Sequence, residues 1–436
     1  MRILTVVGAR PNFVKVAPLL DEMGRYPEME AILVHTGQHY DYEMSKAFFE
    51  DLDIPAPHLN LGVGSGTAVA QVAEIMLRLE QVMEEMEPDV VVVVGDVNST
   101  LAAALTAAKM GLPLAHVEAG LRSFDRTMPE EVNRVITDAL ADFLFVTEPS
   151  GVENLLREGR PEKRIYLVGN VMIDALERFL PRAKRHPVPH ELQAQGESSF
   201  DLTRPYGLVT LHRPSTVDNP ATFRGVWAAL EEIAQEVPLI FPVHPRTQSK
   251  MAEGGFCDAG QDASHGIRVV PPMSYLEFLR LQSQATLMIT DSGGVQEETT
   301  ALGIPCLTVR ENTERPITLT EGTNLLVGLN GRRLVEEARK ILRGEGKKGH
   351  VPELWDGHAS ARIVRTLAGA DIPAKVNLDR ALGELLPARI AQSEALRIVG
   401  RESTAMPQPQ SCALRDPRDR NPGHVTTELR SAQSGT

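Results

Sequence analysis

Asp291-Ser-Gly-Gly-Val-Gln-Glu-Glu298 is the stretch that decides the fold. It follows a short apolar, β-prone run at residues 285–290 and leads into a helical pattern that closes at Gly303. A strand that ends in Ser-Gly-Gly and feeds a helix offers free backbone N–H groups and the positive end of a helix dipole to a ligand. Paired glycines also let a phosphate approach the backbone closely. The stretch predicts a phosphate-binding turn in an α/β sheet, although a Gly-Gly pair alone would equally fit a plain turn.

The composition excludes several classes of protein. A chain of 436 residues is too long for one ordinary hydrophobic core, so we expect two domains with extra segments. Asp and Glu outnumber Lys and Arg by 58 to 45, and the net charge of −13 argues against a nucleic-acid or anionic-membrane partner. Three cysteines without disulfide or zinc spacing indicate a reducing compartment. Neither a signal peptide nor an apolar run of roughly 20 residues is visible, so we expect a cytoplasmic protein.

Strand and helix patterns alternate along the chain in two series. The predicted strands are continuous apolar runs, typical of parallel strands buried on both faces, at residues 3–7, 31–35, 89–94, 114–117, 143–146 and 165–168, and then at 207–211, 239–243, 267–270, 286–290, 305–309 and 324–327. The first helix is expected from about Val14, and a linker is expected at residues 181–204. The alternation predicts an α/β protein with two Rossmann-like, doubly wound domains that face each other across a cleft.

The domain limits follow from the same patterns. The first Rossmann-like domain is expected at residues 1–170, and the second, which would bind the nucleotide, at residues 171–354. A helix at residues 355–370 closes the globular part. Residues 371–436 are rich in Pro, Arg, Ser and Gln toward their end, so we expect a largely disordered extension.

Charged side chains follow several predicted strands, at the edge where open α/β sheets bind ligands. Arg10 and Lys15 straddle the junction between the first strand and its helix. Acidic residues and one histidine come just after other strands or at a helix start, namely Asp96, Glu118, Glu130, Glu131 and His212. Each would be an ordinary solvated charge if it stood alone. Carboxylates crowded into one cleft, however, raise one another's pKa values and can serve as acids and bases near neutrality.

Motifs for other chemistries are missing from the sequence. It has no G-x-G-x-x-G dinucleotide fingerprint, no Gly-x-Ser-x-Gly elbow, no Walker A loop and no His, Cys or Asp set with firm metal spacing. The sequence therefore indicates acid–base chemistry on a nucleotide-bound substrate, with no cofactor and no metal.

A set of motifs, in order over residues 1–370, carries a resemblance to a known family. The motifs are Gly8-Ala-Arg-Pro11, Thr36-Gly-Gln-His39, Gly95-Asp96, His116-Val-Glu-Ala-Gly-Leu-Arg122, Met128-Pro-Glu-Glu-Val-Asn-Arg134, Leu211-His-Arg213, Thr290-Asp-Ser-Gly-Gly-Val-Gln-Glu-Glu298, Thr313-Glu-Arg-Pro316 and Glu321-Gly-Thr-Asn-Leu325. Their combination closely resembles the non-hydrolysing UDP-N-acetylglucosamine 2-epimerases. The resemblance implies a fold like that of the B-type glycosyltransferases (GT-B), a UDP-sugar substrate and a homodimer.

The resemblance also implies roles for individual residues. Those that match residues implicated in catalysis are Asp96, Glu118, Glu130 and His212, with Glu130 chosen over Glu131 as the first Glu after Met-Pro. Those that match substrate contacts are Arg10 and Lys15 on the diphosphate, the amides of Ser292, Gly293 and Gly294 on a phosphate, Glu298 on the ribose, Phe278 near the uridine and Arg315 on the substrate side.

The chemistry of such a reaction can be tested against these residues. The C2 proton of an N-acetylhexosamine lies next to no carbonyl, so a side chain cannot remove it unaided. Departure of UDP from C1 would acidify that proton, and this route needs a diphosphate clamp and carboxylates near the sugar. We therefore expect reversible epimerisation of UDP-N-acetylglucosamine to UDP-N-acetylmannosamine through a 2-acetamidoglucal, supplying precursors of cell-surface polysaccharides. A B-type glycosyltransferase and a sibling 2-epimerase for a diacetamido uronic UDP-sugar are the alternatives, and Glu314-Arg-Pro316 favours the plain sugar.

Overall fold

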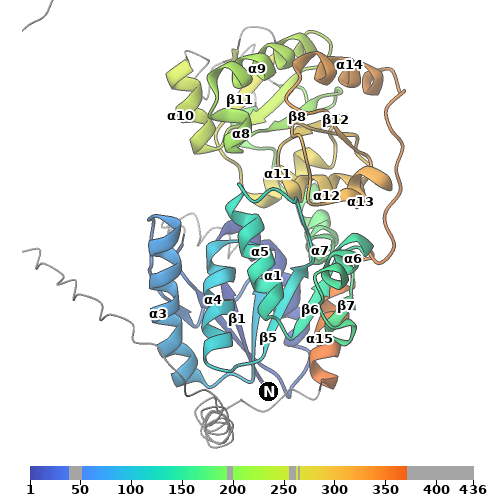
Figure 1. Cartoon of the computed structure of the whole chain (residues 1–436). Coiled ribbons are helices and arrows are strands. Elements are labelled where there is room, and N and C mark those ends of the chain that lie inside the picture. The colour runs from blue at the N-terminus through green and yellow to red at the C-terminus, as the bar shows by residue number, and fades with distance from the viewer. Residues whose placement is uncertain (39–51, 194–199, 255–261, 264–265, 371–436) are drawn as a thin grey trace, which may run out of the picture. The chain divides into compact units, whose positions relative to one another are not determined.

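The computed structural model describes residues 1–38, 52–193, 200–254, 262–263 and 266–370. Within this part of the chain, the strands form two seven-stranded sheets (Figure 1). The first sheet has the order β3-β2-β1-β4-β5-β6-β7 and is parallel throughout. Its strands are β1 (Arg2–Val7), β2 (Glu30–His35), β3 (Leu59–Asn60), β4 (Val90–Val94), β5 (Leu114–Ala119), β6 (Phe143–Val146) and β7 (Ile165–Leu167).

The second sheet repeats the winding of the first. Its order is β10-β11-β9-β8-β12-β13-β14, and only the short β10 runs antiparallel to its neighbour among the described strands. Its strands are β8 (Gly207–Thr210), β9 (Leu239–Pro242), β10 (Asp262–Ala263), β11 (Ile267–Val270), β12 (Leu287–Thr290), β13 (Cys306–Thr308) and β14 (Asn324–Leu326). The strand order reverses between β1 and β4 in one sheet and between β8 and β12 in the other. These reversals are the switch points at which doubly wound sheets bind ligands, and the predicted fold class is confirmed.

Helices connect the strands in both sheets. They are α1 (Arg10–Met23), α3 (Ala68–Met86), α4 (Asn98–Lys109), α5 (Pro129–Leu140), α6 (Pro149–Arg157), α7 (Val171–Arg185), α8 (Pro214–Val217), α9 (Pro220–Ala234), α10 (Pro245–Gly254), α11 (Tyr275–Gln282), α12 (Gly293–Leu302), α13 (Pro316–Thr320), α14 (Gly331–Leu342) and α15 (Ala359–Gly369). Among the described residues, none of the helices combines the length and the apolarity needed to span a bilayer.

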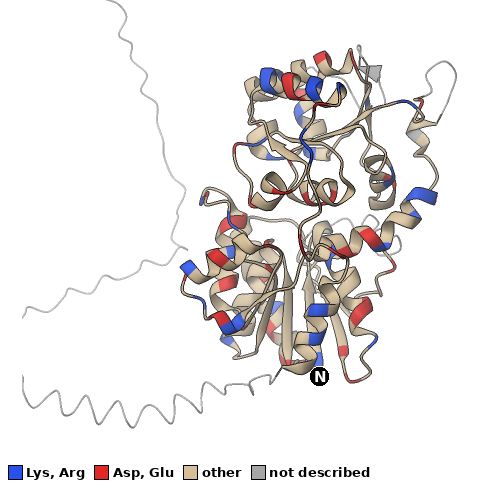
Figure 2. Ribbon diagram, turned by 90° about the vertical axis from the view of Figure 1, so that its right-hand side faces the viewer, with Lys and Arg blue, Asp and Glu red and all other residues tan. Residues whose placement is uncertain are grey.

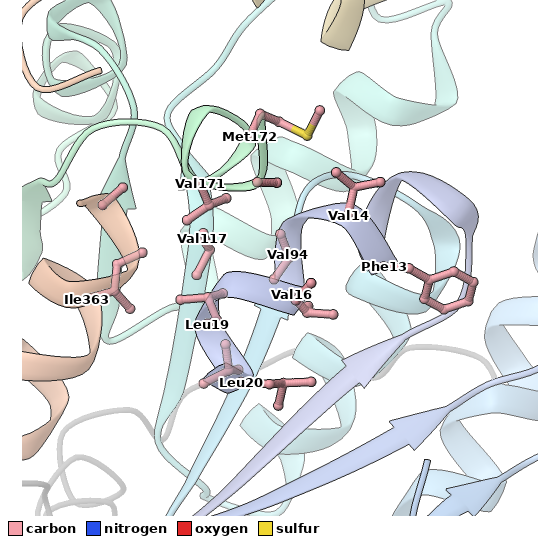
Figure 3. Packing of buried hydrophobic residues seen from close by; sticks show 14 of the residues in the cluster. Phe13, Val14, Val16, Leu19, Leu20, Val94, Val117, Val171, Met172 and Ile363 are labelled. Atoms are coloured by element: carbon pink, nitrogen blue, oxygen red, sulfur yellow. The ribbon is translucent and has the colours of Figure 1, made fainter. Parts of the chain in front are cut away.

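The first sheet is buried on both faces because successive strand residues point to opposite sides. On β4, Val90, Val92 and Val94 join one hydrophobic cluster with α1, α7 and α15, whereas Val91 and Val93 join another cluster with α3 and α4. Figure 3 shows the first of these clusters, with side chains of α1 packed between the strands, α7 and α15. In Figure 2 the charged residues lie mostly on helices and loops, and the strands are largely uncharged. The strand sequences are continuously apolar because the sheet is buried on both faces.

Two helices differ from the sequence-based prediction. α1 begins at Arg10 rather than near Val14, since the Oδ1 atom of Asn12 accepts hydrogen bonds from the N–H groups of Gly8 at 3.3 Å and Ala9 at 3.2 Å and so closes the first turn. α7 continues to Arg185, through Pro181, so residues 181–185 are helical and not part of a linker. The two-residue strands β3 and β10 were not predicted, because so short a segment has no readable periodicity.

α7 and α15 connect the helices of the two sheets. α7 packs against α1 and α15 and also against α11 and α12. The carboxylate of Asp174 on α7 accepts hydrogen bonds from the N–H groups of Ala359 at 3.0 Å and Ser360 at 2.6 Å, which caps α15. The described residues up to 370 belong to one compact unit, and the boundary expected at residue 170 stays a prediction. The expected disorder at residues 371–436 lies outside the described residues.

Candidate active site

The carboxyl ends of β1, β4 and β5 bring a buried ion pair to the first switch point. The Nζ atom of Lys15 on α1 lies 2.5 Å from Oε2 of Glu118 on β5, and both side chains are almost fully buried. Gly95, directly after β4, leaves room for this pair, because a Cβ atom there would lie 3.2 Å from Nζ of Lys15. The structure therefore joins two of the predicted site residues that are 103 positions apart in the sequence.

Glu118 has a strained backbone. Its φ of 72° lies in the left-handed region that favours glycine, and the pairing of β5 with β6 shifts register between Val117 and Ala119. A bulge of this kind re-aims a side chain, and such strain persists only where the surroundings fix it. Among the described residues, no group hydrogen-bonds to the buried Oε1 atom of Glu118. This oxygen is free to accept a proton from a ligand.

Asp96 follows β4 and pairs with Arg134 on α5. Burial raises the pKa of Asp96, but the positive charges of Arg134, Lys15 and Arg315 outweigh that effect and hold the pKa below its ordinary value. Asp96 is therefore ionised at neutral pH. Arg315 belongs to the loop after β13, so its influence places Asp96 close to residues of the second sheet.

The structure separates the roles of Glu130 and Glu131. Glu131 is buried and accepts hydrogen bonds from Ser123 N–H at 3.0 Å and from Phe124 N–H at 2.9 Å, and it forms an ion pair with Arg134. Through these contacts, Glu131 holds the loop before α5 in place. Glu130 is half-exposed instead, and its Oε1 atom lies 3.2 Å from a guanidinium nitrogen of Arg213, directly after β8. Of the two residues, Glu130 is the one available to a ligand.

At the second switch point, Asp291 connects the end of β12 to the end of β8. Its carboxylate accepts hydrogen bonds from the N–H groups of His212 at 2.9 Å and Arg213 at 2.8 Å, and it lies 3.1 Å from Nδ1 of His212. Burial raises the pKa of Asp291, whereas the His212 ring and these N–H groups lower it, and the net pKa is below the ordinary value. Asp291 thus fixes the His212 ring through Nδ1 and leaves Nε2 on the other side of the ring.

The predicted phosphate-binding turn is the start of α12. The helix begins at Gly293, so the N–H groups of Gly293 and Gly294 lie in its first turn, where no intrahelical acceptor exists. The N–H of Ser292, in contrast, donates to Oγ1 of Thr290 at 3.0 Å. The guanidinium of Arg315 lies against this turn, since a Cβ atom on Gly293 would be 2.6 Å from one of its nitrogens. Backbone amides and a fixed positive charge are therefore presented together.

Buried acids hold Arg315 in place. Its Nε atom lies 2.7 Å from Oε1 of Glu297, and a terminal nitrogen lies 3.2 Å from Oε1 of Glu314. The pKa of Glu314 is strongly lowered, because Arg315 and Arg310 outweigh the effect of burial. The pKa of Glu297 is raised, first by burial and then by the charge of Glu118, although Arg315 opposes the rise. The acids of the first sheet and the cation of the second sheet therefore act on each other directly.

Glu298 lies on α12 and Phe278 lies on α11. Glu298 is buried, and its Oε1 atom accepts a hydrogen bond from the hydroxyl of Tyr275 at 2.9 Å. Burial raises the pKa of Glu298 to about 7, although this hydrogen bond opposes the rise. Phe278 is half-buried one turn after Tyr275 and packs against the hydrophobic cluster that contains Val295. These residues form the part of the candidate site next to α12.

The sequence did not single out Glu148, which follows β6. Burial raises the pKa of Glu148 to about 7, and the charge of Glu297 adds to the rise. Its carboxylate accepts hydrogen bonds from the Ser150 hydroxyl and from the N–H of Ile317 on α13. Its position directly after a strand is the same signal that identified Asp96, so the residue could have been found.

The structure brings most of the predicted residues into one charged cluster. Hydrogen bonds, ion pairs or mutual electrostatic effects connect Lys15, Asp96, Glu118 and Arg315. Glu130 reaches the cluster through Arg213, next to His212. The side chain of Arg10 lies outside the described residues. Residues of the site to which the sequence assigned no role are His116, Arg134, Asp138, Glu148, Arg213, Asp291, Glu297 and Glu314.

Comparisons with known proteins agree with this geometry. The family model described as UDP-N-acetylglucosamine 2-epimerase matches residues 21–368. The UDP-N-acetylglucosamine 2-epimerase of Methanocaldococcus jannaschii is 40% identical over 369 residues, which are 84% of this chain and 99% of that protein. The UDP-2,3-diacetamido-2,3-dideoxy-D-glucuronate 2-epimerase of Pseudomonas aeruginosa is 39% identical over 371 residues, which are 84% of this chain and 99% of that protein.

Solved structures give the same result. The crystal structure of the M. jannaschii enzyme in complex with UDP-GlcNAc and UDP superposes with a TM-score of 0.76 at 40% identity, over 85% of this chain and 100% of that one. The structure of the Neisseria meningitidis enzyme bound to UDP-GlcNAc gives 0.76 at 28% identity, with the same shares covered. The two-sheet fold, its switch-point residues and these matches agree: the chain belongs to the UDP-N-acetylglucosamine 2-epimerase family.

Proposed function

We propose that this protein reversibly inverts C2 of UDP-N-acetylglucosamine, with UDP-N-acetylmannosamine as the product. One observation carries the proposal: the phosphate-type site and the carboxylates share a single cluster. Arg315 lies against the first turn of α12 at Gly293, and its charge also interacts with Asp96 and Glu118. A leaving group held at α12 would therefore be close to the groups that can exchange a proton with the sugar. The substrate named for the M. jannaschii relative supports the same assignment.

The proposed reaction has two balanced steps. In the first, a base takes the C2 proton and the electron pair of the C2–H bond forms a C1=C2 double bond, while the C1–O bond breaks and UDP leaves with the electron pair of the C1–O bond. The intermediate is a 2-acetamidoglucal. In the second, an oxygen of the UDP diphosphate adds back to C1 and a proton is delivered to the opposite face of C2. Neither step changes the oxidation level of the overall substrate, and neither requires a cofactor.

Residues of the two sheets would divide the work. Lys15, Arg10, Arg315 and the first amides of α12, those of Gly293 and Gly294, would bind and stabilise the diphosphate as negative charge develops on it. The Ser292 amide, expected from the sequence to join them, donates to Oγ1 of Thr290 instead. The groups available to take and return the C2 proton are Asp96, Glu118, Glu130 and His212. Glu298 would contact the ribose, and Phe278 the uracil.

Proton NMR in D2O tests the proposal. The protein is incubated with UDP-N-acetylglucosamine and without added nicotinamide or metal. We expect UDP-N-acetylmannosamine with deuterium at C2, and traces of 2-acetamidoglucal and UDP would support the elimination route. Product without deuterium at C2 would contradict proton loss from that carbon. An unchanged substrate would argue against this substrate and favour a modified sugar or a glycosyl acceptor.

A second candidate substrate is a UDP-linked 2,3-diacetamido uronic acid. The P. aeruginosa relative named for that substrate is 39% identical, nearly the same as the 40% of the M. jannaschii relative. Parallel assays with both sugar nucleotides decide between them, since the preferred substrate is the one with the higher kcat/KM. The homodimer, the cytoplasmic location and the supply of polysaccharide precursors stay predictions.

A further inference from the structure

A buried histidine lies beneath two of the proposed catalytic acids and takes no part in the reaction proposed above. His116 is on β5, two residues before Glu118, and its side chain is 0% exposed. Its Nε2 atom lies 2.8 Å from the carbonyl oxygen of Gly95, the residue before Asp96. Its Nδ1 atom lies 2.6 Å from Oδ1 of Asp138 on α5. The ring therefore bridges the ends of β4 and β5.

Hydrogen-bond chemistry defines the state of this ring. A carbonyl oxygen can only accept, so Nε2 must carry a hydrogen. The other oxygen of Asp138 accepts a hydrogen bond from the N–H of Gly120 at 3.0 Å and lies 2.7 Å from a guanidinium nitrogen of Arg122. Burial raises the pKa of Asp138, but His116 and Arg122 outweigh burial and lower it below its ordinary value. The Asp138 carboxylate therefore faces the His116 ring on one side and Arg122 on the other.

We propose that His116 is a positioning residue that fixes Asp96 and Glu118 relative to each other. Through one ring it ties the turn at Gly95, which has a φ of 69°, to the bulge at Glu118, which has a φ of 72°. Asp138 joins the same ring to Gly120, on the far side of the bulge. Strain at a non-glycine residue persists only where its surroundings over-determine it, and this network supplies that constraint on both sides of Glu118.

Arg122 anchors the network to a further element. Its guanidinium forms two hydrogen bonds of 2.7 Å with Glu158, at the end of α6, in addition to its contact with Asp138. His116 and Arg122 thus share Asp138, and Glu158 offsets the charge of Arg122. A buried polar network is stable only when every member has its partners. Removal of the His116 ring would therefore leave one oxygen of Asp138 without its partner and the Gly95 carbonyl without its donor.

The hydrogen bond from the ring to Gly95 can be measured on the unmodified protein. The protein has 12 histidines, and selective labelling with 15N-histidine allows their ring N–H groups to be observed by NMR. We expect an Nε2–H resonance from His116 in slow exchange with solvent, because the ring is fully buried and donates to the Gly95 carbonyl. This resonance should be missing from the His116→Gln variant. An Nε2–H of His116 that exchanges rapidly with solvent would overturn the assignment, and this readout is independent of any catalytic activity.

The positioning role is tested by kinetics, and this part rests on the proposed function. In His116→Gln we expect kcat to fall by roughly 10²-fold, because small displacements of catalytic groups cost about that much. The dissociation constant for UDP should change by less than about threefold, because binding relies mainly on the second sheet. His58→Gln is the matched control. The His58 ring accepts a hydrogen bond from the N–H of Leu33 at 3.1 Å at the far edge of the sheet, and its loss should leave kcat unchanged.

Asp138→Asn is the second variant, chosen because it keeps the size of the side chain. We expect the same fall in kcat with retained UDP affinity. An unchanged kcat in both variants would overturn the positioning role. Equal losses of kcat and UDP affinity in both variants would also overturn it, because they would indicate a general effect on the fold. Activity of the wild-type protein, measured in parallel, shows separately whether the proposed function itself holds.

Discussion

The two switch points share one strand order and differ in their chemistry. At the first, between β1 and β4, the groups at the carboxyl edge of the sheet are side chains with opposite charges, such as Lys15, Asp96 and Glu118. At the second, between β8 and β12, they are the backbone amides that open α12 and the guanidinium of Arg315. The strand order determines where a ligand can bind, and the residues after each strand determine what that edge does.

Backbone geometry follows the same division. At the second switch point, the glycine at 293 lets the guanidinium of Arg315 approach the main chain. At the first, a glutamate occupies a left-handed conformation that a glycine would adopt at lower cost, with a φ of 72° at Glu118. Backbone strain thus occurs at Glu118, whose side chain must point in one direction. At the second switch point a glycine occupies the position where another group approaches the main chain. The first edge is suited to proton transfer and the second to holding a leaving group.

Glu118→Gln should have the largest effect. The amide cannot accept the C2 proton, so we expect kcat to fall by about 10²- to 10⁴-fold, the usual contribution of a general base. The UDP dissociation constant should change far less, because Arg315 and α12 are untouched. Initial rates by NMR and isothermal titration calorimetry with UDP measure the two effects. If UDP affinity fell as much as kcat, the division between the two edges would be wrong.

Glu148 lies where the two regions meet, and its effect depends on pH. Its pKa in the folded state is about 7, above the ordinary value of 4.5. A carboxyl group with a raised folded-state pKa stabilises the fold fully below pH 4.5, and that contribution is lost as pH rises through 7. The loss is about 3 kcal/mol for one group. Relative to wild type, Glu148→Gln should therefore gain up to about 3 kcal/mol in free energy of unfolding between pH 5 and pH 8.

Urea denaturation at the two pH values measures this difference. Glu153→Gln is the matched control, because Glu153 lies on α6 but is exposed and pairs only with Arg157 on the surface. Its difference from wild type should be the same at pH 5 and pH 8. A Glu148→Gln difference that also stays constant would mean that the carboxyl group does not hold a proton in the folded protein.

Gly293→Ala should weaken only the second edge. The new Cβ atom would lie 2.6 Å from a guanidinium nitrogen of Arg315, so the guanidinium has to move. We expect the UDP dissociation constant to rise roughly tenfold, or about 1.4 kcal/mol, as measured by calorimetry. Gly225→Ala on α9 is the control, since among the described residues no atom outside the glycine's own stretch of helix lies within 4 Å of its Cβ position. Unchanged UDP affinity in Gly293→Ala would show that Arg315 can bind the substrate from a different position.

The sequence predicted the framework and most of the site because both leave local signals. The apolar runs at β1, β4 and β12 predict buried strands of a doubly wound protein, and residues after the strand ends are candidate site residues because of their position. The sequence could not predict which of these residues pair with one another. Nothing local pairs Lys15 with Glu118, or Asp96 with Arg134, because those contacts follow from how α1 and α5 pack on the sheet.

Residues whose role is to hold another side chain in place could not be predicted, for the same reason. Asp291 stands inside the stretch that decides the fold, yet its task is to hold His212, 79 positions earlier. Glu131 and Glu130 are neighbours with similar patterns, and only the structure shows that Glu131 is occupied by the Ser123 loop. The start of α1 was misplaced because the hydrogen bonds from Gly8 and Ala9 to Asn12 do not resemble a common capping sequence.

Tyr275→Phe should give the smallest effect and tests how the second edge is supported. It removes the hydroxyl that donates to Glu298 at 2.9 Å, a loss of about 1 kcal/mol, so UDP affinity should fall several-fold if Glu298 contacts the ribose. Tyr206→Phe is the matched control, because its hydroxyl donates to the carbonyl of Leu281 at 2.7 Å in the same half of the molecule. Both variants should lose similar thermal stability, and only Tyr275→Phe should lose affinity. If the two variants bound UDP with equal affinity in calorimetry, Glu298 would be a core residue of the second sheet and not part of the ligand-binding edge.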